Sequence, residues 1–180
     1  LDLLLSDDFA DSARLASELE DTNTRRRTIE AELAEVASAQ AEQVFKGQRA
    51  LVVAGEGWHE GVKGIVASRL ANRYGVPTLL FTIEGDEAHG SGRSVGQVNL
   101  FQAVSNCQDI LVRFGGHHAA VGVTLKADKI PEFTERLCEY MDKLPPEDFI
   151  PRIEVDASVD LSELTLANVE KLDLLAPFGQ

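Results

Sequence analysis

The chain has 180 residues, of which 44% are hydrophobic and 26% charged, a composition typical of a globular protein able to bury its own core. No apolar run reaches the roughly 18 residues that a membrane span needs, and the first apolar run, residues 3–5, is too short for a signal peptide. The two cysteines match no metal-ligand spacing, so we expect a reduced, cytoplasmic protein. Taken alone, the net charge of −13 argues against a polyanionic partner. However, residues 46–130 carry nine basic and seven acidic side chains, so this middle segment can still hold a local anion site.

Residues 9–45 are predicted to form one long helix. Apolar residues recur there in alternating steps of four and three, no Gly or Pro interrupts them, and Lys46-Gly47 ends the segment. Arg26 occupies a position on this stripe where Leu or Ile would be expected, with Asn23 and Glu30 beside it. An arginine that leans inward needs a carboxylate or an anionic ligand, so both a salt bridge to Glu30 and an anion contact are open.

The middle of the chain alternates between strands and helices. The predicted strands cover residues 50–54, 78–83 and 119–125, and residues 89–95 are expected to be partly extended. The predicted helices cover residues 62–74, a short stretch capped by Asn99, and residues 128–143 with Asp128 as cap. In the tail, residues 153–157 alternate as a strand would, and residues 164–172 suit a short amphipathic helix. This order predicts an α/β fold with a mixed β-sheet flanked by helices.

Three glycine-containing motifs are the candidates for chemistry. Trp58-His-Glu-Gly61 precedes a predicted helix, where free N–H groups favour anions; we favour a packing role for Trp58 and leave His59 open. Gly90-Ser-Gly-Arg-Ser94 presents hydroxyls and a guanidinium suited to phosphate, although the same residues suit a surface hairpin. Arg113-Phe-Gly-Gly-His117 fits either a tight turn into a strand or a ligand-binding loop.

The sequence lacks the motifs typical of several other classes of enzyme. No phosphate-binding loop lysine, zinc-ligand spacing or nucleophilic cysteine context occurs, and the two cysteines, Cys107 and Cys138, are far apart in the sequence.

Taken in order, these motifs resemble those of the RecJ family, bacterial single-stranded-DNA-specific 5′-to-3′ exonucleases of the DHH phosphoesterase superfamily. The resemblance extends from the segment Asn23 to Glu30, which is similar to the family's connecting helix, to Leu174-Leu-Ala-Pro-Phe-Gly179, which is similar to the start of its OB-fold region. It implies a long connecting helix over residues 1–46, a DHHA1-type substrate-binding domain over residues 47–146, and a linker with the start of an OB-fold-like region over residues 147–180.

The resemblance also implies roles for particular residues. His117 is expected to approach the scissile phosphate as a catalytic contact, and Ser91 and Arg93 to belong to the pocket for the DNA 5′-phosphate or the nearby backbone. The full set of expected substrate-binding residues is Asn23, Arg26, His59, Ser91, Arg93, Ser94, Gly115 and Gly116. No metal ligand is expected in this chain.

The implied function is that of the DNA-binding part of an exonuclease acting in DNA repair and recombination. The metal-binding DHH domain of the same polypeptide is expected to precede Leu1, so the chain is expected to be a fragment that is inactive alone. Mn²⁺ or Mg²⁺ would serve the intact, monomeric, bacterial cytoplasmic enzyme, whose partner is the 5′-phosphate end of single-stranded DNA, with no membrane contact. The alternatives are a DHH-family phosphodiesterase for oligonucleotides or cyclic dinucleotides and a non-enzymatic nucleic-acid-binding module.

Overall fold

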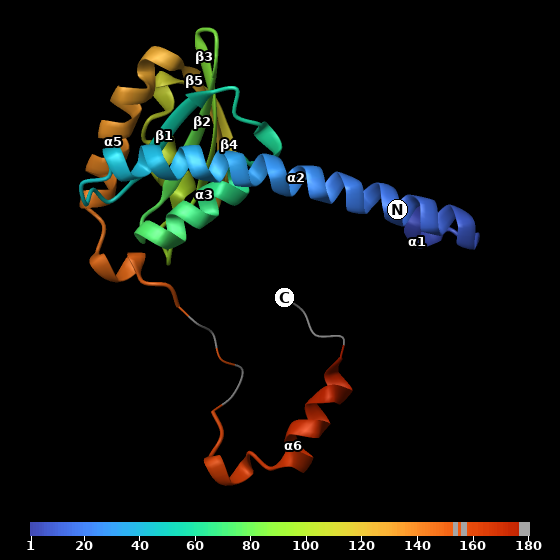
Figure 1. Cartoon of the computed structure of the whole chain (residues 1–180). Coiled ribbons are helices and arrows are strands. Elements are labelled where there is room, and N and C mark those ends of the chain that lie inside the picture. Colours follow the sequence, from blue (N-terminus) through green and yellow to red (C-terminus); the bar gives the residue numbers. More distant parts are fainter. Residues whose placement is uncertain (153–154, 156–157, 177–180) are drawn as a thin grey trace.

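The computed structural model describes residues 1–152, 155 and 158–176, and a five-stranded mixed sheet forms its centre (Figure 1). The strands are β1 (Leu51–Glu56), β2 (Thr78–Glu84), β3 (Glu87–Arg93), β4 (Leu111–His117) and β5 (Ala120–Lys126), in the order β1-β2-β3-β5-β4. β1 and β2 are parallel, because α3 crosses between them, and the other neighbours are antiparallel. The predicted α/β class with a mixed sheet is confirmed.

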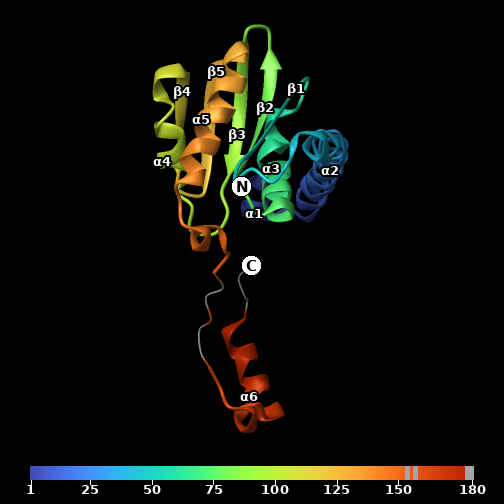
Figure 2. The ribbon, with the colours of Figure 1, turned by 90° about the vertical axis from the view of Figure 1, so that its left-hand side faces the viewer.

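Helices cover the two faces of the sheet unequally. α2 (Phe9–Val44) and α3 (Glu60–Tyr74) lie on one side, and α4 (Leu100–Ser105) and α5 (Ile130–Asp142) lie on the other (Figure 2). Leu51, Val53 and Leu80 pack with α3, whereas the opposite face packs against Phe133 and Leu137 of α5. On the α3 side, the helices pack mainly against β1, β2 and β3. The outer strands β5 and β4 therefore keep exposed residues on that face.

The long helix forms as predicted, and Asp8 caps its first turn by accepting from the Asp11 N–H. Its buried residues are Glu30, Leu33, Ala37 and Ala41, all in the second half. The first half extends away from the sheet (Figure 1). Hence only the second half of α2 is held by the sheet domain. The remaining short helices are α1 (Asp2–Leu5), α6 (Leu166–Glu170), η1 (Gln108–Ile110), η2 (Ala127–Lys129), η3 (Pro146–Phe149), η4 (Leu161–Glu163) and η5 (Lys171–Leu175).

Two predictions of secondary structure need correction. Asp128 does not cap a helix, because residues 127–129 form the 3-10 turn η2 and α5 begins only at Ile130, with a proline in its first turn and no side-chain cap. Residues 111–117 form a strand that was not predicted, because Gly115 and Gly116 interrupt its β-forming residues. The predicted glycine turn is thus the end of β4.

The tail is only partly described. α6 and η5 cover most of the short helix predicted over residues 164–172. Of the strand predicted over residues 153–157, all positions except 155 lie outside the described residues, as does the end of the segment similar to an OB-fold region. No helix in the described part of the chain is long and apolar enough to cross a membrane.

Candidate functional site

The exposed part of the sheet on the α3 side carries most of the candidate residues. Side chains on a strand alternate between faces, so register decides which residues share this side. Ser91 of β3 is opposite Gly122 of β5, which in turn is opposite Gly115 of β4. The neighbouring rows on the same face are His89, Thr124 and Arg113 at one end, and Arg93, Ala120 and His117 at the other.

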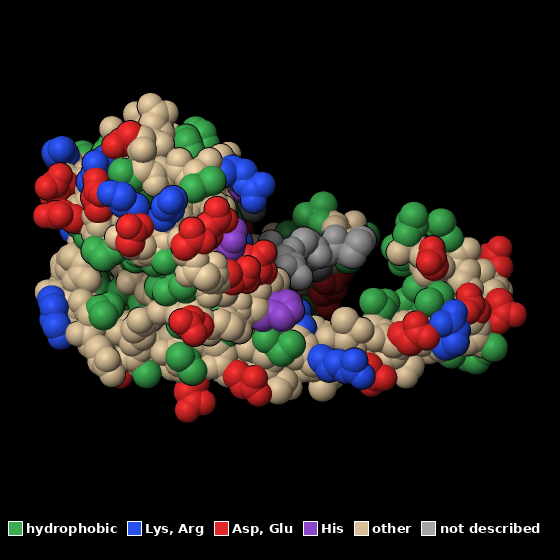
Figure 3. Space-filling model, turned by 90° about the horizontal axis from the view of Figure 1, so that it is seen from above, with side chains coloured by type: hydrophobic (Ala, Val, Ile, Leu, Met, Phe, Trp, Pro, Cys, Tyr) green, Lys and Arg blue, Asp and Glu red, His purple; other side chains and the backbone are tan. Residues whose placement is uncertain are grey.

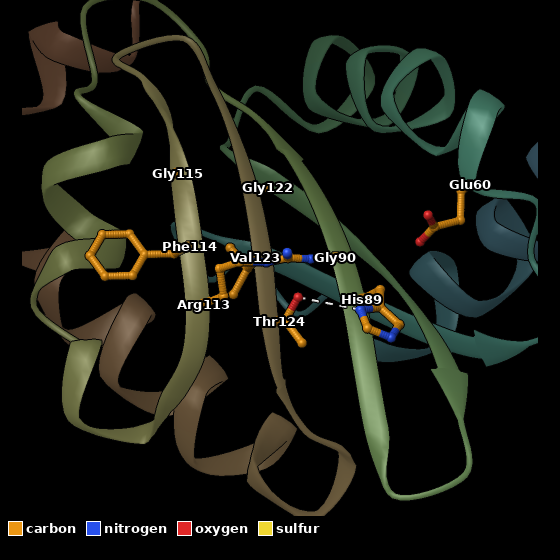
Figure 4. Close-up of a pocket in the computed structure, with 9 residues that line it drawn as sticks. All are labelled: Glu60, His89, Gly90, Arg113, Phe114, Gly115, Gly122, Val123 and Thr124. Atoms are coloured by element: carbon orange, nitrogen blue, oxygen red, sulfur yellow. Dashed lines mark hydrogen bonds between the residues drawn. The ribbon is translucent and has the colours of Figure 1, made fainter.

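Gly115 and Gly122 form a flat floor at the centre of this face. Both are exposed, and a Cβ atom added to either would meet no atom within 4 Å. A cavity of about 390 Å³ opens over the floor (Figure 4); its lining consists of Glu60, His89, Gly90, Arg113, Phe114, Gly115, Gly122, Val123 and Thr124. Peptide groups at the floor can therefore approach a ligand without side chains between them.

Polar groups surround this cavity. The Nδ1 atom of His89 lies 3.3 Å from the Thr124 hydroxyl. The buried Lys63 of α3 donates from Nζ to the His89 carbonyl at 2.5 Å and to the Glu60 carboxylate at 3.1 Å. The Lys63 hydrogen bond lowers the pKa of Glu60, so Glu60 is a carboxylate at neutral pH. The Arg113 side chain is exposed at the same rim.

Ser91 and Arg93 form one polar unit at the other end of β3. The Arg93 guanidinium donates to the Ser91 hydroxyl at 3.2 Å and to the Gly92 carbonyl at 2.8 Å. It lies against Gly64 of α3, where an added Cβ would come within 2.2 Å of its Nη2 atom. The guanidinium is half-buried, and only Nη1 has a hydrogen-bond partner among the described residues. Guanidinium N–H groups without a protein partner suit the recognition of an anion.

Ser94 lies just beyond β3, and its hydroxyl is already engaged. It donates to the Val98 carbonyl at 2.6 Å, and the Ser94 N–H donates to the Ala119 carbonyl. The residue thereby ties the loop after β3 to the turn between β4 and β5.

His117 is the last residue of β4 and is exposed. Its Nδ1 atom accepts from the Ala119 N–H at 3.3 Å, so the neutral ring carries its proton on Nε2. Gly116 before it has a φ of +139°, and a Cβ there would lie 2.2 Å from the Ala120 carbonyl oxygen. His118 contributes its carbonyl to the Leu100 N–H.

His59 caps α3, with its Nδ1 accepting from the Gly61 N–H at 3.1 Å. Trp58 packs over Gly55 and joins the core between the sheet and α2, the packing position that the sequence favours.

On α2, Arg26 forms the salt bridge to Glu30 and also donates to the Asn23 side-chain oxygen.

Four polar residues that line the cavity, namely Glu60, His89, Arg113 and Thr124, are not among the binding residues expected from the sequence, although Glu60 and Arg113 belong to its glycine-containing motifs. One signal in the sequence could have indicated His89. Every second residue from Glu87 to Arg93 is polar, as on a strand with one polar face.

The described residues include no group of three or more His, Cys, Asp or Glu side chains that could hold a metal ion. Acidic and basic side chains are interspersed over the surface seen from above (Figure 3).

Comparison with known proteins gives consistent matches. Residues 47–143 match the family model of the DHHA1 domain. The chain is 40% identical over 98% of its length to the single-stranded-DNA-specific exonuclease RecJ of Bacillus subtilis and 33% identical over its whole length to that of Thermus thermophilus. It spans 23% and 26% of those relatives, about a quarter of their length.

Solved structures agree with the sequence matches. The crystal structure of Thermus thermophilus RecJ in complex with Mg²⁺ is similar to 98% of this chain with a TM-score of 0.79 and 31% identity, and the chain covers 27% of it. The structure of the same protein with Mn²⁺ gives a TM-score of 0.78. The described arrangement of helix and sheet is thus similar to one region of a larger protein.

Proposed function

Because this chain belongs to the DHHA1 domain family, we propose that it is the DNA-binding DHHA1 part of a RecJ-like 5′-to-3′ single-stranded-DNA exonuclease. The intact protein would hydrolyse phosphodiester bonds at the 5′ end of single strands, in DNA repair and recombination. The observation that carries the proposal is the α3-side face of the sheet, which is uncovered over β4 and β5. The Gly115–Gly122 floor and His117 lie there, and the Ser91–Arg93 unit of β3 lies at its border with α3.

Ser91 and Arg93 would bind the 5′-phosphate. The free guanidinium N–H groups of Arg93 supply charge-assisted donors, and the Ser91 hydroxyl fixes the direction of the guanidinium. The strand would then lie along the glycine floor, where Gly115 and Gly122 allow the DNA backbone to come close. Gly116 would support the strand indirectly, by setting the backbone before His117.

His117 would be the catalytic contact of this chain. Since its Nδ1 atom is occupied by the Ala119 N–H, the Nε2–H group is the donor that can reach an oxygen of the scissile phosphate. A donor aimed at the oxygen on which charge develops stabilises the transition state. Its exposed position at the end of β4 leaves it accessible to a second domain.

The remaining predicted residues would bind or support the strand. Asn23 and Arg26 project from α2 beside the sheet domain, and His59 lies at the α3 N-terminus, where N–H groups favour phosphate. Ser94 would act mainly by holding the loop between Arg93 and the β4–β5 turn, because its hydroxyl already donates to Val98.

The metal would be held outside this chain. The described residues lack a suitable ligand group, so the residues present here do not fit a metal ion. We propose that Mn²⁺ or Mg²⁺ is bound by a DHH domain of the same, monomeric polypeptide, and that the 180-residue chain alone is inactive. The RecJ structures with Mg²⁺ and Mn²⁺ support metal use in the intact protein.

The test is hydrolysis of a single-stranded oligonucleotide by the intact polypeptide with Mn²⁺, with 5′-phosphate and 5′-hydroxyl ends compared. We expect release of nucleotides from the 5′ end, a strong loss of kcat for His117→Ala, and a reduced preference for the 5′-phosphate for Arg93→Ala. Degradation from the 3′ end, or identical preference in wild type and Arg93→Ala, would contradict the proposal. Hydrolysis of dinucleotides without longer strands would indicate an oligonucleotide phosphodiesterase instead.

A further inference from the structure

A second basic site lies apart from the sheet face, in a cleft between α2 and α3. The cleft has a volume of about 580 Å³, and its lining is Arg26, Arg27, Glu30, Ala31, Ile65 and Arg69. Three arginines and one glutamate therefore meet at the junction of the two helices. Ala31 and Ile65 supply apolar walls, so the polar chemistry of the cleft is that of the arginines and Glu30.

Glu30 is the centre of this cluster. Its side chain is only 5% exposed, and its carboxylate pairs with Arg26 on one oxygen and with Arg69 on the other. One cation is enough to compensate the negative charge of a buried carboxylate. Glu30 has two arginine partners, so the pairing leaves one positive charge uncompensated. The pairing fixes one end of each guanidinium at the base of the cleft.

The outer parts of the arginines face solvent. The side chains of Arg26 and Arg69 are 40% and 60% exposed, and the neighbouring Arg27 is exposed and has no ion pair among the described residues. The cleft thus has an excess of two positive charges in a chain whose net charge is −13. Guanidinium groups held in place suit the bidentate recognition of phosphate oxygens.

We propose that this cleft is a second phosphate site, which binds a backbone phosphate of the single strand through Arg27 and Arg69. Glu30 is the positioning residue, and Arg26, whose guanidinium also donates to Asn23, is its second partner. The inference rests on the proposed function and deepens it. α3 links the two sites, because Gly64 contacts Arg93 while Arg69, about 7.5 Å further along the helix axis, lines the cleft. For a strand held at its 5′ end by Arg93, the proposal places a later phosphate of the same strand in this cleft.

The chain contains a matched control for this site. Arg73 of α3 pairs with Glu42 of α2 at 2.7 Å, and both side chains are more than half exposed. This pair joins the same two helices but does not line the cleft. Arg73→Gln and Glu42→Gln therefore reproduce the charge changes of Arg69→Gln and Glu30→Gln without altering the proposed site.

The first measurement is the salt dependence of single-strand binding by the intact polypeptide, with labelled oligothymidylate and the metal chelated. Each phosphate contact with a single strand contributes about 0.7 to the slope of log affinity against log salt. For Arg69→Gln we expect a slope smaller by about 0.7 and an affinity lower by about fivefold. Arg73→Gln should keep the wild-type slope.

The second measurement is the direction in which single-strand affinity changes when each glutamate is neutralised. Glu30→Gln and Glu42→Gln each remove one negative charge, which by long-range electrostatics alone tightens DNA binding. If Glu30 positions the arginines, Glu30→Gln should instead weaken binding by about threefold, because the guanidinium groups of Arg26 and Arg69 lose the ion pairs that hold them in place. Thermal unfolding of both variants shows whether the fold is kept; if Glu30→Gln unfolds, the exposed Arg69→Gln variant decides the question.

Equal slopes for Arg69→Gln and Arg73→Gln, or tighter binding by Glu30→Gln, would overturn the cleft as a phosphate site. Strands with 5′-phosphate and 5′-hydroxyl ends separate this inference from the proposed function. Arg69→Gln should weaken both strands equally, whereas Arg93→Ala should weaken only the phosphorylated one. An effect of Arg93→Ala without one of Arg69→Gln rejects the cleft alone, and an intact polypeptide that binds no single strand rejects both.

Discussion

The guanidinium of Arg93 rests on the backbone of Gly64, so closely that a methyl group on Gly64 would lie 2.2 Å from Nη2 and 2.9 Å from the guanidinium carbon. A glycine inside a helix costs about 1 kcal/mol relative to alanine. Here the missing side chain gives Arg93 its place between α3 and β3. The position of the proposed phosphate-binding arginine thus depends on a residue in a different element.

Gly64→Ala should separate stability from binding. The alanine favours the helix, but its methyl group forces Arg93 to move. We expect an unfolding free energy within about 1 kcal/mol of wild type and a loss of most of the preference for 5′-phosphorylated strands. Gly61→Ala is the comparison variant. Its methyl group meets the His59 ring, at 3.1 Å, and not Arg93, so it can lower overall strand affinity but should keep the end preference. Unchanged end preference in Gly64→Ala would show that Arg93 does not need this position.

Gly122→Val tests the glycine floor. Valine suits a strand, and the space above Gly122 is empty, so stability should stay equal or rise by up to about 1 kcal/mol. The added side chain would fill the cavity over Gly115, and single-strand affinity should fall by about tenfold, or about 1.4 kcal/mol. Chemical denaturation and fluorescence anisotropy measure the two effects. Full affinity in a stably folded Gly122→Val protein would place the strand elsewhere.

Gly116→Ala should act on stability instead. Its φ of +139° is unfavourable for any other residue, and the methyl group would collide with the Ala120 carbonyl. We expect a loss of about 1–3 kcal/mol in unfolding free energy. Gly115→Ala, one residue earlier and in open space, should leave stability nearly unchanged. Equal stability of the two variants would mean that the β4–β5 turn adapts.

The Glu60–Lys63 pair predicts a pH dependence. The folded state lowers the pKa of Glu60, chiefly through the hydrogen bond from Lys63, so the stabilisation is present above the ordinary value of 4.5 and is lost as pH falls through the lower folded value. Glu60 is 67% exposed, so solvent screening limits the effect to on the order of 0.5 kcal/mol. Urea unfolding at pH 7 and pH 3.5 should show a smaller decrease for Glu60→Gln than for wild type. An identical decrease would mean that Lys63 does not stabilise the Glu60 carboxylate.

Local patterns in the sequence determined much of this protein. The apolar spacing from Leu15 to Val44 predicts the long helix, and Gly75 marks the end of α3, where it adopts a left-handed conformation. The order of the glycine motifs also indicated the family. These features depend on neighbours within a few residues, so the sequence carries them directly.

Only the tertiary structure decided which residues meet. The contacts between Gly115 and Gly122, between His89 and Thr124, and between Glu30 and Arg69 arise from strand register and from the packing of α3 on α2. Register and helix packing are set by the whole core, so no local pattern specifies them. For the same reason the sequence suggested that Arg26 needs an anionic partner, but the fold was required to place Arg69 on the same carboxylate.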